Sequence, residues 1–202
     1  MKKYMISFIL FLLSIVGYGQ TAKDYYNKGV EKAYAENYRG AIEDYNRAIG
    51  IDGNYATAYL NRGVAKSYLG DYRGAIEDYT KCIVISGNSH YAPYINRGVT
   101  KLKLGDYRGA ILDFTTAIEI NPDYEEAYYR RGNSKFVLED LRGAIADYTK
   151  TISIKPNFAA AYSQMGLAKL LLEEKNSGCL DLSKAGELGS EDAYELIKKY
   201  CN

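Results

Sequence analysis

The chain has 202 residues, of which 26 are basic and 25 acidic, so its formal net charge is close to zero. This balance gives no long-range attraction to nucleic acid or to an anionic membrane, and no nucleic-acid partner is predicted. The single histidine, His90, ends the loop-like stretch Ser86–His90, where we interpret it as a solvated loop residue.

The first 19 residues have the pattern of a cleaved signal peptide. Lys2 and Lys3 form a charged start, the mostly apolar run Met5–Val16 follows, and small residues precede a cleavage site before Gln20. A membrane anchor is the alternative, but a run of about 12 residues is short for a bilayer that needs about 20. We therefore expect an exported protein of the bacterial envelope, periplasmic or secreted, with no membrane insertion after cleavage.

Beyond this segment, five glycines recur with gaps of 34, 35, 34 and 34 residues. They are Gly29, Gly63, Gly98, Gly132 and Gly166. Such self-similarity is typical of a repeat solenoid, in which each unit buries its apolar face only by stacking on its neighbours. We predict repeats at residues 22–55, 56–89, 91–124 and 125–158, with an incomplete fifth repeat from residue 159.

Each repeat is predicted to be two helices joined by a tight turn. In Gly70-Asp71 and Gly105-Asp106, the glycine ends the first helix and the aspartate caps the second. Asn37 and Asp140 take the capping position in the other two complete repeats. Glycine or proline pairs such as Gly53-Asn54 and Pro122-Asp123 then stop the second helix.

The recurring glycine falls in the middle of the first helix, where it costs roughly 1 kcal/mol relative to alanine. A second column of small residues lies on the second helix: Ala41, Ala75, Ala110 and Ala144. We expect each glycine to face an alanine, which would allow the two helices to cross closely. Recurring aromatic residues of both helices, among them Tyr94 and Phe114, are expected to fill the space beside the crossing.

These columns resemble the tetratricopeptide repeat over about Ala22 to Glu173. The family pattern Trp-x-x-Leu-Gly-x-x-Tyr, Ala-x-x-x-Phe and Pro is present as Tyr94-x-x-Arg97-Gly98-x-x-Lys101, Ala110-x-x-x-Phe114 and Pro122. The resemblance implies an all-α, right-handed superhelix of helix–turn–helix units. Residues 174–202 are predicted as capping helices that end the solenoid.

Two basic columns depart from the family pattern. Arginine replaces the usual leucine at Arg62, Arg97 and Arg131, and lysine replaces the usual tyrosine one helical turn later. The second helices carry a matching acidic column: Asp44, Asp78, Asp113 and Asp147. Because the two signs recur together, we interpret them as ion pairs along the solenoid, Arg97 with Asp113 and likewise in the neighbouring repeats.

In this family the first helices line a concave surface that binds peptides, often in extended form. Carried over to this sequence, the candidate groove contains asparagines that can bond any peptide backbone, together with valines and tyrosines suited to small apolar side chains. Its predicted residues are Tyr26, Asn27, Val30, Tyr34, Asn61, Val64, Tyr68, Asn96, Val99, Lys103, Tyr129, Arg130, Asn133 and Val137.

Some family members bind a chain-terminal carboxylate with a clamp of lysine, asparagine and arginine residues. Asn61, Asn96 and Arg130 match part of this pattern, but Glu126 stands where the clamp has a lysine. The sequence therefore favours a peptide segment over a terminal carboxylate.

The three cysteines divide into two kinds. Cys82 replaces a small residue of a second helix and is predicted to be a buried, inert thiol. Cys179 and Cys201 flank a predicted hairpin of helices at Gly178–Leu188 and Glu191–Tyr200, which brings both to the same end. In an oxidising compartment this arrangement favours a disulfide.

The leading functional prediction is a non-enzymatic scaffold that binds a protein or peptide in the groove, without cofactor or metal. The alternative is a structural component of an envelope assembly that uses the convex face or the solenoid ends. An enzyme is poorly supported because the sequence has no histidine–nucleophile pairing, no phosphate-binding glycine loop and no metal-ligand cluster. Its oligomeric state is left open.

Overall fold

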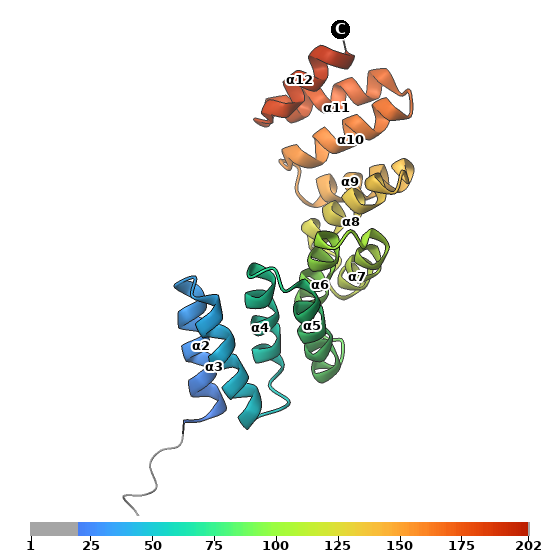
Figure 1. Ribbon diagram of the computed structural model, residues 1–202. Coiled ribbons are helices and arrows are strands. Elements are labelled where there is room, and N and C mark those ends of the chain that lie inside the picture. Colours follow the sequence, from blue (N-terminus) through green and yellow to red (C-terminus); the bar gives the residue numbers. More distant parts are fainter. Residues whose placement is uncertain (1–19, 202) are drawn as a thin grey trace, which may run out of the picture.

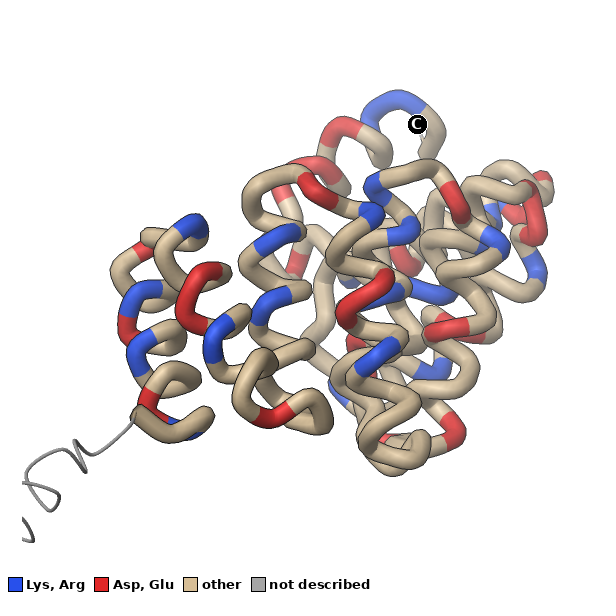
Figure 2. Tube along the Cα trace, turned by 60° about the horizontal axis from the view of Figure 1, so that its bottom comes forward, with Lys and Arg blue, Asp and Glu red and all other residues tan. Residues whose placement is uncertain are grey.

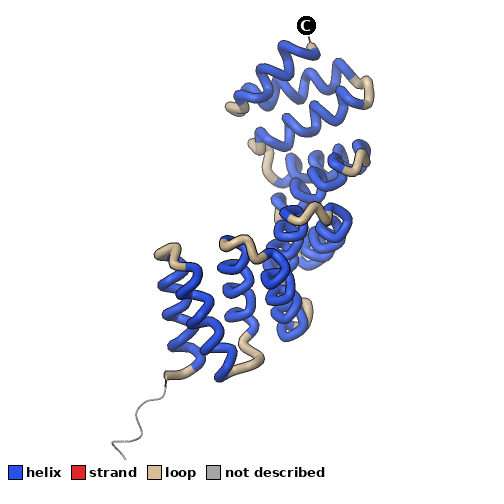
Figure 3. The backbone as a smooth tube through the Cα atoms, in the orientation of Figure 1, coloured by secondary structure: helices blue, strands red, loops and turns tan. Residues whose placement is uncertain are grey.

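The computed structural model describes residues 20–201, so the predicted signal peptide lies outside the described residues. Within this range the chain is helical, with short loops and no strand (Figure 3). The first helices of the repeats are α2 (Ala22–Tyr34), α4 (Ala56–Tyr68), α6 (Ala92–Lys103), α8 (Glu125–Val137) and α10 (Ala159–Leu171). The second helices are α3 (Tyr38–Ile51), α5 (Tyr72–Ser86), α7 (Tyr107–Ile120), α9 (Leu141–Ile154) and α11 (Lys175–Glu187). Helix α12 (Glu191–Tyr200) follows them.

Helix pairs stack in chain order from α2–α3 to α10–α11, and the stack turns progressively along its length (Figure 1). Each helix packs on the one before it and the one after it, as a solenoid requires. The all-α solenoid predicted from the glycine spacing is confirmed. None of the described helices is both long and apolar enough to span a bilayer.

The turn inside each repeat follows the predicted chemistry. Gly70 and Gly105 adopt the left-handed conformation, with φ of 82° and 75°. The next residue caps the second helix, so that the Asp106 carboxylate accepts a hydrogen bond from the Gly109 backbone N–H at 2.8 Å. A glycine recurs at this third helical position, because a Cβ on Gly109 would collide with the capping carboxylate. The role of this second glycine column was missed by sequence reasoning.

The mid-helix glycines lie at close helix crossings, and the nearest partner of the four from Gly29 to Gly132 is an aromatic ring. A Cβ on Gly98 would lie 2.8 Å from the Phe114 ring, and one on Gly29 would lie 2.5 Å from the Tyr45 ring. The alanine column also lies at the crossing, since a Cβ on Gly63 would lie 3.2 Å from the Ala75 carbonyl oxygen. Alanines such as Ala110 are fully buried beside the crossing, while the aromatic ring of the second helix packs against the glycine.

The predicted ion pairs are present and form a charge ladder, which has an arginine, a lysine and an aspartate in each central repeat. The Arg97 guanidinium donates to Asp113 through Nη2 at 2.7 Å, and Lys101 Nζ lies 2.8 Å from the same carboxylate. Arg62 with Asp78 and Arg131 with Asp147 repeat this arrangement. Acidic and basic residues are accordingly interleaved along the stack (Figure 2).

The acidic members are buried, which changes their energetic role. Asp113 is 3% exposed, whereas the side chains of Arg97 and Lys101 are 17% and 19% exposed. Ion pairs in which both partners reach solvent are worth only about 0–1 kcal/mol each. A buried carboxylate needs its partners, so removing one leaves a costly uncompensated charge. Arg97 also donates to Thr80 of the preceding repeat, and the ladder thereby links neighbouring units.

The C-terminal end differs from the predicted hairpin in one respect. Helix α11 begins at Lys175 rather than at Gly178, and it pairs with α10 as every second helix pairs with its first. Gly178 and Gly166 face each other at this crossing, where a Cβ on either would lie 2.8 Å from the other's carbonyl oxygen. The incomplete fifth repeat is thus a full helix pair, and α12 alone extends the solenoid.

Cys179 and Cys201 meet at the predicted end, with Cα atoms 5.8 Å apart and sulfur atoms at bonding distance. This separation falls within the range that disulfides require. Their oxidation in the protein remains a prediction. Cys82 is buried, as predicted, and burial raises the pKa of its thiol.

Candidate peptide-binding groove

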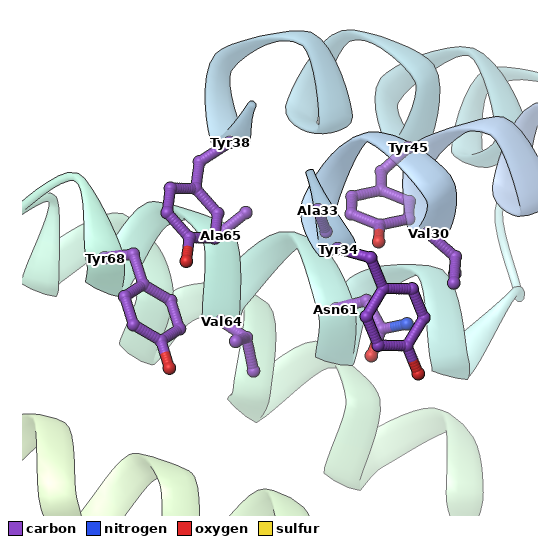
Figure 4. Close-up of a pocket in the computed structure, with 9 residues that line it drawn as sticks. All are labelled: Val30, Ala33, Tyr34, Tyr38, Tyr45, Asn61, Val64, Ala65 and Tyr68. Atoms are coloured by element: carbon purple, nitrogen blue, oxygen red, sulfur yellow. The ribbon is translucent and has the colours of Figure 1, made fainter. Parts of the chain in front are cut away.

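Helices α2, α3 and α4 enclose a hollow of about 270 Å³, which we call site 1 (Figure 4). Its residues are Val30, Ala33 and Tyr34 of α2, Tyr38 and Tyr45 of α3, and Asn61, Val64, Ala65 and Tyr68 of α4. Four tyrosines and two valines dominate this lining, and none of its described residues is charged. The site therefore suits uncharged, apolar groups.

A second hollow of about 410 Å³ lies along α4, α5 and α6, and we call it site 2. Its residues are Val64, Ser67, Tyr68, Tyr72, Tyr79, Asn96, Val99, Thr100 and Lys103. Each of these positions is a site 1 position moved by one repeat. Val64 and Tyr68 line both hollows, so the two sites form one groove across three repeats.

Tyr38 and Tyr68 form a stacked aromatic wall of this groove. Their rings stack at 4.6 Å between centroids and are tilted by only 2°. Tyr68 nevertheless remains 68% exposed, and the neighbouring Tyr34 is 87% exposed. Tyrosine usually buries its ring, so two exposed rings beside an apolar hollow indicate a surface suited to a ligand.

Asn61 lies at the floor of site 1 and is partly engaged within the protein. Its Nδ2 donates to the Tyr26 hydroxyl at 3.0 Å. Burial raises the pKa of the nearby Tyr45 hydroxyl to about 12. An amide has two N–H donors and an acceptor oxygen, so Asn61 keeps hydrogen-bonding capacity for a peptide. The bond to Tyr26 also fixes its orientation.

The next interval, between α6 and α8, carries different residues at the same columns. Arg130 stands where Asn61 and Asn96 stand, and it pairs with Glu126 at 2.8 Å. Asn133 replaces the valine and accepts a hydrogen bond from the Tyr148 hydroxyl at 2.9 Å. A lining that combines asparagine, valine and tyrosine is therefore confined to sites 1 and 2.

Eight of the predicted groove residues line sites 1 and 2: Val30, Tyr34, Asn61, Val64, Tyr68, Asn96, Val99 and Lys103. The others do not. Tyr26 packs against Tyr45 and Tyr55. Asn27 is exposed and lines neither site. Tyr129 and Val137 line separate hollows towards the C-terminal end.

Eight lining residues of sites 1 and 2 were missed by sequence reasoning, among them Tyr38 and Tyr72. Tyr38 and Tyr72 begin second helices, and the prediction drew only on first helices. Their spacing of one repeat could have identified them, because each stands directly after the turn that joins a first helix to its second helix. Peptide binding by this groove stays a prediction.

Comparison with protein families identifies the repeat. The model of the TPR repeat matches residues 98–138, and that of the tetratricopeptide repeat matches residues 56–88 and 125–158. The chain is a tetratricopeptide repeat protein. The identification agrees with the paired helices, the glycine–aromatic crossings and the capped turns described above. No curated protein matches its sequence.

Solved structures share the fold of this tetratricopeptide repeat protein over nearly its whole length. A crystal structure of MamA protein is 29% identical, with a TM-score of 0.79, and the match covers 90% of this chain and 96% of that one. YrrB, described as a TPR protein with an unusual peptide-binding site, is 21% identical with a TM-score of 0.79, over 94% and 97% of the two chains. MamA from Desulfovibrio magneticus RS-1 is 21% identical with the same score, over 84% and 96%.

Proposed function

We propose that this protein is a non-enzymatic interaction scaffold that binds an extended protein segment in the groove formed by sites 1 and 2. The observation that carries the proposal is the duplication of one lining in consecutive repeats, with Val64 and Tyr68 shared. A duplicated site suits a linear ligand that presents similar side chains at regular intervals. The description of YrrB as a TPR protein with a peptide-binding site supports the same class of function.

Hydrogen-bonding groups and apolar walls have complementary roles in this proposal. Asn61 and Asn96 occupy equivalent positions and offer amide groups to a peptide backbone. The valines and tyrosines beside them receive side chains. Affinity then derives from apolar burial, while the asparagines set the register of the chain.

The test is binding of peptides selected from a random display library against the purified protein. Val64→Glu places a charge in the wall shared by both sites and should abolish binding. The matched control is Val84→Glu, since Val84 is 71% exposed on α5 and lines neither site. Asn61→Ala with Asn96→Ala should also abolish binding. Equal binding by the Val64→Glu variant and the parent protein would refute groove binding.

A second candidate is assembly through the outer face of the solenoid. Leu112 of α7 and Leu180 of α11 are 69% and 72% exposed at equivalent positions of second helices. Such residues could pack against an envelope component. Loss of a partner on Leu112→Glu, with Val64→Glu unaffected, would favour this role over groove binding.

Export belongs to the same proposal. The pattern of residues 1–19 supports removal of a signal peptide and location in the periplasm or outside the cell. N-terminal sequencing of the protein recovered from its native host tests this directly. A mature chain that begins at Gln20 would support export, and an intact Met1 in the cytosolic fraction would refute it.

A further inference from the structure

We propose that the groove selects a proline-rich segment in the polyproline II conformation, with an acidic residue at the α6 end. The proposal rests on the proposed function, because it names the ligand class of the same groove. It follows from four properties of sites 1 and 2: their aromatic faces, their spacing, the nature of their walls, and the position of Lys103.

The first property is a set of flat, pre-positioned tyrosine rings. Tyr38 and Tyr68 hold each other in a parallel stack, and Tyr34 stands exposed across site 1 (Figure 4). Tyr72 takes the place of Tyr38 in site 2. Polyproline II segments dock in aromatic-lined grooves, where the ligand is rigid before binding and loses little entropy. A wall that is also fixed beforehand lowers the entropic cost further.

The second property is spacing. Polyproline II has three residues per turn and a rise of about 3.1 Å per residue, which gives roughly 9 Å per turn. In the protein, sites 1 and 2 repeat one lining, and α2 meets α4 in the same limited way as α4 meets α6. A ligand with a regular turn presents its side chains at constant intervals along this repeated lining. Ligand residues separated by whole turns would then enter equivalent positions in sites 1 and 2.

The third property is that helices form both sites. An added β-strand needs an open edge of alternating backbone donors and acceptors. Within α2 to α6 the backbone groups are already engaged inside the helices, so only side chains remain to bond the ligand. Proline has no N–H to satisfy, while its carbonyl can accept from an asparagine amide or a tyrosine hydroxyl. Asn61, Asn96 and the exposed Tyr34 hydroxyl supply such donors.

The fourth property is the change from Tyr34 and Tyr68 to Lys103 along one column. Among the described residues, Lys103 is the only charged one that lines either site, and it lies at the α6 end of the groove. A ligand that is otherwise uncharged would gain from one acidic residue at this end. The charge also gives the groove a direction, since the lining of site 1 offers no such partner.

The test uses the purified protein and a blocked peptide of about twelve residues, four turns of repeated Pro-Pro-Ser with a terminal aspartate. Fluorescence anisotropy measures its affinity against a matched peptide with alanine in place of every proline. We expect the alanine peptide to bind at least about tenfold more weakly, because it must become ordered on binding and offers no proline rings. Equal binding of the two peptides would overturn the proposal.

Single substitutions test whether the proline peptide binds at sites 1 and 2. Tyr68→Ala should weaken binding of the proline peptide by about tenfold or more, since this ring lines both sites. Tyr68→Phe should keep the affinity within about threefold of that of the parent protein. Tyr107→Ala is the matched control, because Tyr107 occupies the column of Tyr38 and Tyr72 but lines neither site. Circular dichroism confirms that each variant is folded. A Tyr107→Ala loss as large as that of Tyr68→Ala would overturn the assignment.

Charge reversal at Lys103 tests the direction in which the peptide lies in the groove. Lys103→Glu should weaken the aspartate peptide and favour the same peptide with a terminal lysine. If the proline peptides fail but display-selected peptides of other composition bind in a manner abolished by Val64→Glu, this inference is wrong and the proposed function stands. If no peptide of either kind shows Val64-dependent binding, both fail.

Discussion

The helix crossings and the groove lie on the same first helices, yet their columns behave differently along the chain. At the crossings, glycine recurs in all five repeats and the arginine–lysine–aspartate arrangement recurs in the three central ones. In the groove, the asparagine column changes to Arg130 and the tyrosine column to Lys103. A crossing must satisfy the same packing in every unit, whereas a groove is shaped by what it binds. Recurrence in every repeat therefore indicates packing, whereas a lining that recurs in only two consecutive sites indicates recognition.

The largest expected effect comes from filling a crossing. Gly98→Leu should lower the free energy of unfolding by about 3 kcal/mol or more, because the side chain cannot fit between α6 and the Phe114 ring. Denaturant unfolding measures it. The control is Gly50→Ala, at a helical glycine where an added Cβ would meet no packing neighbour within 4 Å, which should raise stability by up to about 1 kcal/mol. Similar losses in both variants would contradict the packing role.

Reduction of the Cys179–Cys201 pair should weaken the end of the solenoid and leave the groove intact. A bridge over a sequence separation of 22 residues is worth about 3 kcal/mol in the chain-entropy model. Hydrogen exchange should therefore accelerate in α12 on reduction, with α4 and α6 unchanged. Thiol titration of the unfolded, unreduced protein should find one free thiol, that of Cys82, and three free thiols would refute the bridge.

The next largest loss of stability is expected when an aspartate of the charge ladder is removed. Asp113→Ala leaves Arg97 and Lys101 without their shared carboxylate and should cost about 2–3 kcal/mol, less than for fully buried cations because both reach solvent. Asp181 is the matched control, since it pairs with Lys169 and its side chain is 15% exposed. Asp181→Ala should cost about 1 kcal/mol or less. Equal costs in thermal or denaturant unfolding would show that burial of the acid is not decisive.

The smallest effect on stability is expected in the groove. Tyr34 is 87% exposed, so Tyr34→Ala should change the free energy of unfolding by no more than about 0.5 kcal/mol. The substitution should still weaken ligand binding, because the ring lines site 1. A large stability loss would place Tyr34 among the packing residues and remove the contrast between the two regions.

Much of the fold could be predicted from the sequence because repetition multiplies a weak signal. One mid-helix glycine says little, but five at regular spacing, with caps such as Asp71 and Asp106 between them, determine the helix pairs and their turns. The joint recurrence of basic and acidic columns also predicted the partners of Arg62, Arg97 and Arg131. These features depend on neighbours within one repeat, so local spacing is enough.

Tertiary structure alone decided which surfaces meet. It placed an aromatic ring nearest to each of the four glycines from Gly29 to Gly132, and it buried the ladder carboxylates. It brought Tyr38 to Tyr68 across 30 residues and merged two equivalent hollows into one groove, while leaving Tyr26 and Asn27 outside it. Spacing gives the positions of residues along a helix, but the angle at which neighbouring repeats pack sets which of them share a surface.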